Sequence, residues 1–99
     1  MDIDPEDEKE FNEWYDTEHI PMFLKVPGVI EAKRAKLVNN YSGPKYITIY
    51  KYEDDRVAKS KEYKKVLETP WAKKMMSKLK NWSLDFVKEM PDYWDYQYD

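Results

Sequence analysis

Polar and apolar residues follow a helical periodicity in the first part of this chain. Between residues 4 and 20, aromatic side chains recur at the spacing of one helix face: Phe11, Trp14 and Tyr15. Asp4 followed by Pro5 predicts where the helix begins, because Asp is a good N-cap and proline is favoured in the first turn. Pro21 disfavours helical geometry in the residue before it, so we expect the helix to end or kink near residue 20.

Two later stretches change to the two-residue period of β-strands. Residues 29–38 alternate, and residues 45–52 do so more clearly. In the second stretch the aromatic and threonine side chains face one way and the isoleucines the other: Tyr46, Thr48, Tyr50 and Tyr52 against Ile47 and Ile49. A turn-forming segment at residues 39–44 separates the stretches, which predicts a hairpin.

The remaining third of the chain predicts helices and then two more strands. Ser60 is placed to cap one helix, and Thr69 followed by Pro70 starts another, with Trp71 and Met75 on its inner face. Residues 82–86 alternate again, and so do residues 93–98 beyond a break at Pro91. The sequence therefore predicts a single α+β domain over residues 1–99 in the order helix, strand, strand, helix, strand, strand.

Composition excludes several classes of function. The chain has no cysteine, which removes disulfides and thiolate chemistry, and with one histidine it offers too few ligands for a zinc site. We therefore predict no metal. The net charge of −3 argues against nucleic-acid binding, although residues 59–80 are rich in lysine, which we interpret as a solvated helix face. Apolar runs are too short to cross a membrane and the acidic start is unlike a secretory signal, so a cytoplasmic location is expected.

Several short stretches carry a family resemblance: EWYDTEHIP at residues 13–21, VPG at 26–28, Arg34, PKYITIY at 44–50 and TPW at 69–71. Together they resemble the EthD-like group of dimeric α/β-barrel proteins, over roughly residues 2 to 90. That resemblance implies a ferredoxin-like four-stranded antiparallel sheet with helices on one face. Two such protomers pack their sheets into a barrel that encloses a small-molecule pocket, and members of the group resemble cofactor-free isomerases, cyclases and lyases.

The chain departs from the family pattern in two places. The family begins with a strand, whereas this chain begins at the helix. We expect the C-terminal segment at residues 93–98 to supply that central strand, as in a circular permutation that is natural or engineered; the alternative is a frayed tail beside an incomplete sheet. Ala35 stands where the resemblance suggests an aromatic residue, which would enlarge the neighbouring space.

His19 is the first candidate for catalysis, since its ordinary pKa suits proton transfer near neutral pH. Asp16 or Glu18 would orient the imidazole, and the hydroxyl of Tyr15 would stabilise an oxyanion. The plainer alternative is that a histidine near a helix end caps carbonyl groups or packs as a structural residue.

Five residues are candidates for substrate binding: Trp14, Glu18, Arg34, Tyr46 and Tyr50. Trp14 is equally consistent with a core position. Arg34 suits a carboxylate of the substrate or a salt bridge at the rim. The two tyrosines can line a pocket or fill a dimer core, and the sequence does not separate these roles.

The resulting hypothesis is a cofactor-independent enzyme that moves a proton next to a carbonyl group of a small, largely apolar substrate. We expect no cofactor; haem, with His19 as its axial ligand, is the weaker alternative. The competing hypothesis is a non-catalytic small-molecule binder or an engineered scaffold of the same fold. A homodimer through the sheet face is expected in either case, because so small a domain has more aromatic surface than it can readily bury.

Overall fold

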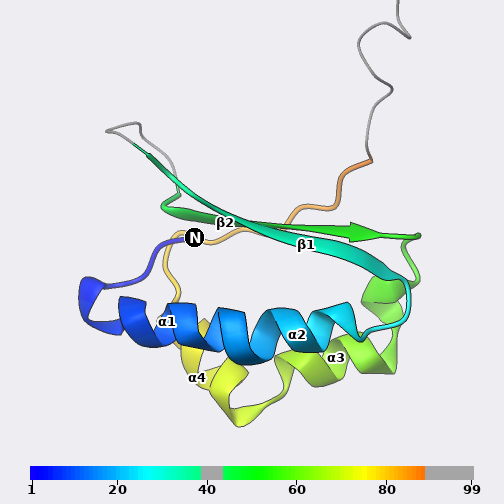
Figure 1. Cartoon of the computed structure of the whole chain (residues 1–99), viewed down its shortest axis with the longest axis horizontal. Helices are drawn as coiled ribbons and strands as arrows, with labels where there is room; N and C mark the ends of the chain where they lie inside the picture. Colours follow the sequence, from blue (N-terminus) through cyan, green and yellow to red (C-terminus); the bar gives the residue numbers. More distant parts are fainter. Residues whose placement is uncertain (39–43, 89–99) are drawn as a thin grey trace, which may run out of the picture.

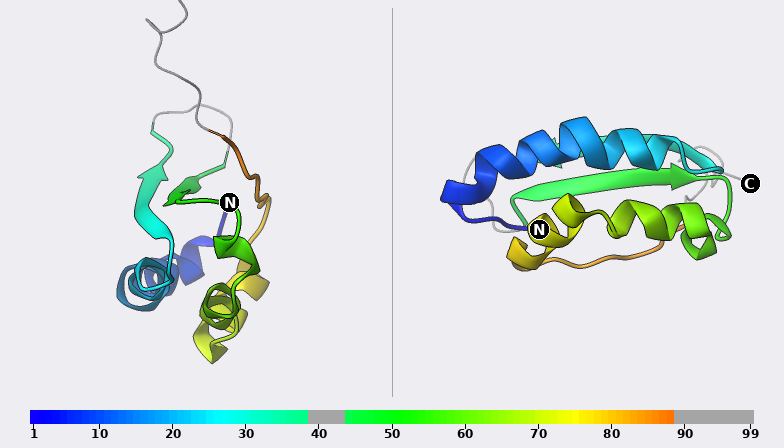
Figure 2. Two further views of the ribbon diagram at one scale, coloured as in Figure 1. Left: turned by 90° about the vertical axis from the view of Figure 1, so that its right-hand side faces the viewer. Right: turned by 90° about the horizontal axis from the view of Figure 1, so that it is seen from below.

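The computed structural model describes residues 1–38 and 44–88. In chain order its elements are η1 (Pro5–Asp7), α1 (Glu8–Trp14), η2 (Tyr15–His19), α2 (Ile20–Leu24), β1 (Val29–Lys36), β2 (Tyr46–Tyr52), η3 (Val57–Lys59), α3 (Lys61–Leu67) and α4 (Pro70–Lys78). The two strands form an antiparallel sheet, and all the helices lie on one face of it (Figure 1). The view from below shows two helical rows, α1 to α2 in one and α3 to α4 in the other (Figure 2).

The first helical row is one continuous helix from residue 8 to residue 24, with a π-turn inside it. η2 is that π-turn, and the Ile20 amide donates to the carbonyl of Tyr15, five residues back. Pro21 explains the irregularity, because proline lacks an N–H and its ring crowds the carbonyl four residues earlier. A wider turn accommodates it. Of the two alternatives predicted near residue 20, an end or a kink, the helix does not end there and is instead distorted by the π-turn.

The predicted hairpin is confirmed, because β1 and β2 pair antiparallel. Arg34 lies opposite Thr48 and Ala32 lies opposite Tyr50, with an irregularity between Val29 and Glu31. The tyrosine-bearing face of β2 packs on the helices, and Tyr46 is 6% exposed. The opposite face carries the isoleucines of β2, which are exposed to solvent. β1 ends at Lys36, two residues before the predicted end.

The second helical row begins where the sequence predicts. The Ser60 hydroxyl accepts a hydrogen bond from the Tyr63 amide at 3.1 Å, and the Thr69 hydroxyl accepts one from the Ala72 amide at 3.0 Å. Each cap satisfies an amide that the first helical turn leaves without a partner. On α4, Met75 is fully buried, as its predicted inward position requires.

The core consists of two clusters beneath the sheet. The larger one joins the first helix, the first residues of the chain and α4 through Ile3, Phe11, Trp14, Tyr15, Tyr46, Ala72 and Met75. The smaller one lies between α2, η3 and α3 and contains Phe23, Val26, Val57 and Val66. The aromatic stripe predicted for the first helix is therefore the centre of the core.

The four-stranded ferredoxin-like sheet expected from the resemblance is wrong. The described residues form a two-stranded sheet, so the four-stranded faces that would close a dimeric α/β barrel are not formed. Residues 82–88 adopt no strand, and Trp82, Leu84 and Phe86 are more than half exposed. Alternation favours a strand only where a neighbour completes the backbone hydrogen bonds. The predicted strand at residues 93–98, which was to supply the first strand, lies outside the described residues.

The start of the chain makes the remaining β contacts. The Met1 amino group donates to the Tyr46 carbonyl at 3.0 Å, and the Tyr46 amide donates to the Met1 carbonyl at 3.0 Å. Asp2 forms an isolated antiparallel bridge with Lys80.

Within the described ranges, none of the helices is both long and apolar enough to cross a membrane.

Candidate functional site

His19 lies at the end of the π-turn and points into the core. It is 5% exposed, and three aromatic rings surround it: its ring centroid lies 4.2 Å from that of Trp14, 4.9 Å from Tyr15 and 4.9 Å from Phe23. Burial lowers its pKa to about 4, with a smaller contribution from the positive charge of Arg34. The imidazole is therefore neutral at pH 7. It acts as a hydrogen-bonding group in an aromatic environment.

Three buried polar atoms, on His19 and on two neighbours of Tyr15, have no partner among the described residues. They are the Nδ1 of His19, the Oγ1 of Thr48 and the hydroxyl of Tyr50. Tyr15 connects them, because its ring contacts His19 and its hydroxyl is near those of Thr48 and Tyr50. Buried polar atoms without partners are uncommon in folded proteins, and they mark places where a bound molecule or water completes the hydrogen bonding.

The tyrosine hydroxyls of this interior cluster stay protonated. Burial raises the pKa of Tyr15, although the neighbouring hydroxyl of Thr48 and the charge of Arg34 oppose the shift. Burial also raises the pKa of Tyr50, and the proximity of Tyr15 adds to that effect. The cluster thus offers neutral hydrogen-bond donors and acceptors and no anion.

Arg34 provides the nearest positive charge. Its guanidinium carbon lies 4.5 Å above the ring of Tyr15. The group donates to the Oδ1 of Asn12 at 2.7 Å and to the Oδ1 of Asp16 at 3.1 Å, while its buried Nε has no partner among the residues that the structure describes. Arg34 therefore forms a salt bridge, which is one of the two roles that the sequence left open. It also stacks on a core aromatic ring, a role that the sequence did not reveal.

The two carboxylates proposed to orient the imidazole are engaged elsewhere. Asp16 is largely exposed and pairs with Arg34. Glu18 accepts hydrogen bonds from the indole N–H of Trp14 at 3.1 Å and from the hydroxyl of Thr69 at 2.7 Å. Its role in this structure is to join the first helix to the start of α4. Tyr15, rather than a carboxylate, is the polar residue that the structure brings to His19.

The other predicted binding residues divide between two places. Trp14 is 1% exposed and stacks on His19, so it belongs to the core and also borders the interior cluster. Tyr50 contributes an unpartnered hydroxyl to the cluster. Tyr46 lies at the start of β2, where its hydroxyl donates to the Oε1 of Glu8 and accepts from the Asn12 side chain at 3.4 Å. Tyr46 is therefore a structural residue of this arrangement.

Thr48 is the member of the cluster that the sequence analysis did not single out. The signal was present, because the two-residue period of β2 places Thr48 between two tyrosines on the buried face. Threonine is common in β-strands, so its presence between tyrosines predicts a strand and indicates no further role. Only the packing of the first helix against that face shows that its hydroxyl is enclosed.

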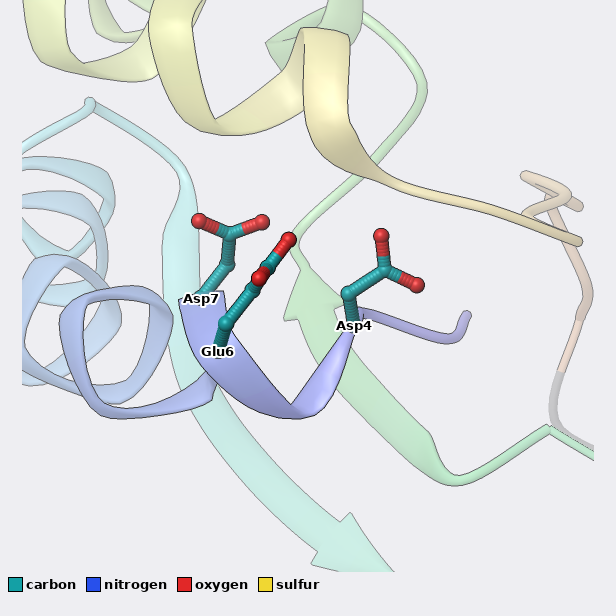
Figure 3. Close-up of side chains that lie close together, drawn as sticks. All are labelled: Asp4, Glu6 and Asp7. Atoms are coloured by element: carbon teal, nitrogen blue, oxygen red, sulfur yellow. The ribbon is translucent and has the colours of Figure 1, made fainter.

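A second group of polar residues lies at the start of the chain (Figure 3). The carboxylates of Asp4, Glu6 and Asp7 approach one another within 4.8 Å. Two of them already have cationic partners, since Lys80 contacts Asp4 at 2.7 Å and Lys78 contacts Asp7 at 2.8 Å. These ion pairs fasten the first helix to the end of α4 and account for the acidic group without a metal ion.

Comparison with known proteins gives a family without an assigned activity. The sequence model of a domain of unknown function, DUF4286, matches residues 1–92. No curated protein and no solved structure matches the chain significantly. The match spans both helical rows, the hairpin and every residue of the interior cluster. This chain therefore belongs to the DUF4286 family.

Proposed function

We propose that this domain binds a small, uncharged and largely apolar molecule at the interior cluster of Tyr15, His19, Thr48 and Tyr50. The observation that carries the proposal is the set of three buried, unpartnered polar atoms among aromatic rings. Ligand sites in proteins typically combine an apolar lining with a few polar groups that fix orientation. The likeness of EWYDTEHIP and its companion stretches to EthD-like proteins supports a small-molecule ligand as well.

The electrostatics of the cluster favour a neutral ligand. His19 is uncharged at pH 7 because burial lowers its pKa to about 4, and the tyrosine hydroxyls keep their protons because burial raises their pKa values. The two terminal nitrogens of the Arg34 guanidinium are committed to Asp16 and Asn12, and its charge is already paired with the Asp16 carboxylate. A charged ligand would lose its hydration without gaining a partner of opposite charge. A hydroxyl or carbonyl group on an aromatic or aliphatic body fits the available donors and acceptors.

Proton-transfer catalysis at the same cluster is the second candidate. Two observations favour it. The Nδ1 of His19 has no partner among the described residues, and the guanidinium of Arg34 is stacked on the ring of Tyr15. It is disfavoured because a base with a pKa of about 4 abstracts protons weakly at neutral pH, and none of the described carboxylates orients it. We therefore place binding first and cofactor-free isomerase, cyclase or lyase chemistry second.

A homodimer through the open sheet face is the assembly we propose. The face of the hairpin that points away from the helices carries Ile47 and Ile49, which are 47% and 59% exposed. Neighbouring residues on this side include Ala35 of β1, opposite Ile47 in the register. An apolar face of this kind is stabilised by packing against a second copy.

Phenol and benzene are matched probes for the binding proposal, because they share an apolar ring and differ by one hydroxyl. Each is titrated into the ¹⁵N-labelled protein while amide shifts are followed by NMR. We expect phenol to shift the amides of His19, Thr48 and Tyr50 and to bind more tightly than benzene. The paired variant Thr48→Val with Tyr50→Phe should weaken phenol binding by about 5- to 10-fold, the value of one net hydrogen bond, and leave benzene binding unchanged.

Two outcomes contradict the proposal. If neither probe shifts these amides, ordered water satisfies the three polar atoms and the cluster is structural. If phenol and benzene bind alike and the paired variant has no effect, the polar atoms do not contribute to recognition. A pH profile of turnover that follows one ionisation, found with a carbonyl substrate and abolished in His19→Gln, would instead favour the catalytic candidate.

A further inference from the structure

Arg34 carries a buried hydrogen-bond donor beside the interior cluster. Its Nε is enclosed and has no partner among the residues that the structure describes, and a guanidinium Nε–H can only donate. The side chain as a whole is 19% exposed. A buried donor without an acceptor costs free energy, so this position favours a bound atom that can accept a hydrogen bond.

The orientation of this guanidinium is fixed from the helix side. One terminal nitrogen donates to the Oδ1 of Asn12 at 2.7 Å, and the other donates to the Oδ1 of Asp16 at 3.1 Å. The guanidinium carbon also lies 4.5 Å from the centroid of the Tyr15 ring and 5.6 Å from that of Phe11. The side chain cannot turn its Nε toward solvent without breaking these contacts.

Thr48 supplies a second donor beside the first. Arg34 and Thr48 are directly opposite each other in the register of β1 and β2. Directly opposed residues have Cβ atoms about 4.5 to 5.5 Å apart, and their side chains lie on the same face of the sheet. That face packs on the helices, since Arg34 stacks on Tyr15 and the hydroxyl of Thr48 is near that of Tyr15. The buried Oγ1 of Thr48 likewise has no partner among the described residues.

These two neighbouring groups together favour an acceptor atom. The Nε–H of Arg34 donates only, and the hydroxyl of Thr48 can rotate to donate toward the same place. A carbonyl oxygen has two lone pairs and accepts both hydrogen bonds at once, one of them from a charged donor and therefore strong. A ligand hydroxyl can accept them as well, but its own proton then needs a further acceptor in the same enclosed space.

The charge of Arg34 does not extend this preference to carboxylates. The carboxylate of Asp16 already pairs with the guanidinium at 3.1 Å. A ligand carboxylate would place a second anion on the same cation and would give up its hydration inside an aromatic environment. A neutral carbonyl group loses much less hydration and still gains the hydrogen bonds.

We propose that Arg34 and Thr48 form a subsite for a neutral carbonyl oxygen, so that the ligand of the interior cluster is an aromatic ketone or a similar apolar carbonyl compound. This inference rests on the proposed function, because it places the apolar body of the ligand among the aromatic rings around Tyr15 and His19. It adds the polar group that the ligand carries and makes Arg34 a specificity-determining residue of the site.

The chain has two arginines, so NMR can observe the Nε–H of Arg34 directly with Arg56 as an internal control. Arg56 donates its Nε–H to the Oδ1 of Asp54 at 3.1 Å, and its side chain is 85% exposed. Acetophenone and ethylbenzene are matched probes, because they are similar in size and differ in the carbonyl oxygen. At ten times its Kd, acetophenone should shift the Arg34 signal and slow its exchange with water by about 10-fold. Ethylbenzene should not slow this exchange, and neither probe should affect Arg56.

Affinity provides a second readout. Acetophenone should bind about 10-fold more tightly than ethylbenzene, which is the value of one hydrogen bond to a charged group. Arg34→Lys keeps a positive charge beside Asp16 and removes the Nε–H, so it should abolish this preference and leave ethylbenzene affinity unchanged. Arg56→Lys is the matched control and should retain the preference. Benzoate should bind more weakly than acetophenone to the natural sequence.

The outcomes separate this inference from the proposed function. If both probes shift the amides of Thr48 and Tyr50 alike and the Arg34 signal does not respond, the cluster binds apolar molecules and has no carbonyl subsite. If benzoate binds more tightly than acetophenone, Arg34 recognises anions and the inference is wrong. An Arg34 signal that exchanges slowly in the free protein and ignores acetophenone would mean that the protein or an ordered water already satisfies the Nε–H. If neither acetophenone nor ethylbenzene shifts these amides, the inference and the proposed function fail together.

Discussion

Acidification should destabilise this protein through His19. The histidine has a pKa of about 4 in the fold, where burial disfavours its charge, against 6.5 in an unfolded chain. Between these two values the unfolded state binds a proton that the folded state does not, so stability falls as the pH falls through this window. From pH 7 to pH 4 the loss attributable to this one residue is about 3 kcal/mol. That is a large part of the stability of a small domain.

The assay is urea denaturation at pH 7, 5.5 and 4, on the natural sequence and on His19→Gln. Gln retains hydrogen-bonding capacity and does not titrate, so the difference between the two pH slopes isolates the histidine. Protonation of the carboxylates whose pKa values are lowered in the fold, such as Glu8 and Glu10, also reduces the free energy of unfolding in acid. That reduction is the same in both proteins. Parallel curves for the two proteins would refute the reasoning and would mean that His19 is accessible to protons in the folded state.

Three further perturbations test the packing. Gly28→Ala should lower the free energy of unfolding by about 2 kcal/mol or more, because Gly28 has φ +92° and a Cβ there would lie 2.5 Å from the Cγ2 of Val57. Unchanged stability in urea denaturation would contradict this expectation. Thr69→Ala should lower the free energy of unfolding by about 1 kcal/mol, because it removes the cap of α4 and the hydrogen bond to Glu18. Thr69→Ser keeps the hydroxyl and should retain most of that stability; thermal melting measures both variants. Ile49→Lys should turn the proposed dimer into a monomer by light scattering, and a natural protein that is already monomeric would refute that assembly.

Local chemistry explains the parts of the fold that could be predicted from the sequence. The β2 strand follows from strict alternation of β-formers, and the two helix starts follow from hydroxyl caps at Ser60 and Thr69, each fulfilled by a hydrogen bond within the next turn. These signals depend on residues close together in the chain, so no knowledge of the tertiary structure was needed to interpret them.

Long-range pairing explains the parts that could not be predicted. Residues 82–86 have the same alternation as β2, but alternation says nothing about whether a neighbour is present to complete the ladder, and here the side chains remain exposed. The assignment of Asp16 and Glu18 to His19 failed for a related reason. Proximity in sequence suggested a contact, whereas Arg34 and Thr69, both distant in sequence, bind those carboxylates instead.

The π-turn links local sequence signals to tertiary packing, because it determines where His19 of the candidate site lies. Phe11, Tyr15, His19 and Phe23 are spaced four residues apart, and in a regular α-helix each such step drifts by about 40° around the axis. Their ring centroids lie 5.1, 4.9 and 4.9 Å apart between successive members, so each ring contacts the next. A turn that holds more residues rotates less per residue and so offsets part of that drift. Pro21, which was predicted to end or kink the helix, is thus accommodated by a π-turn that keeps the ring of His19 against the ring of Tyr15.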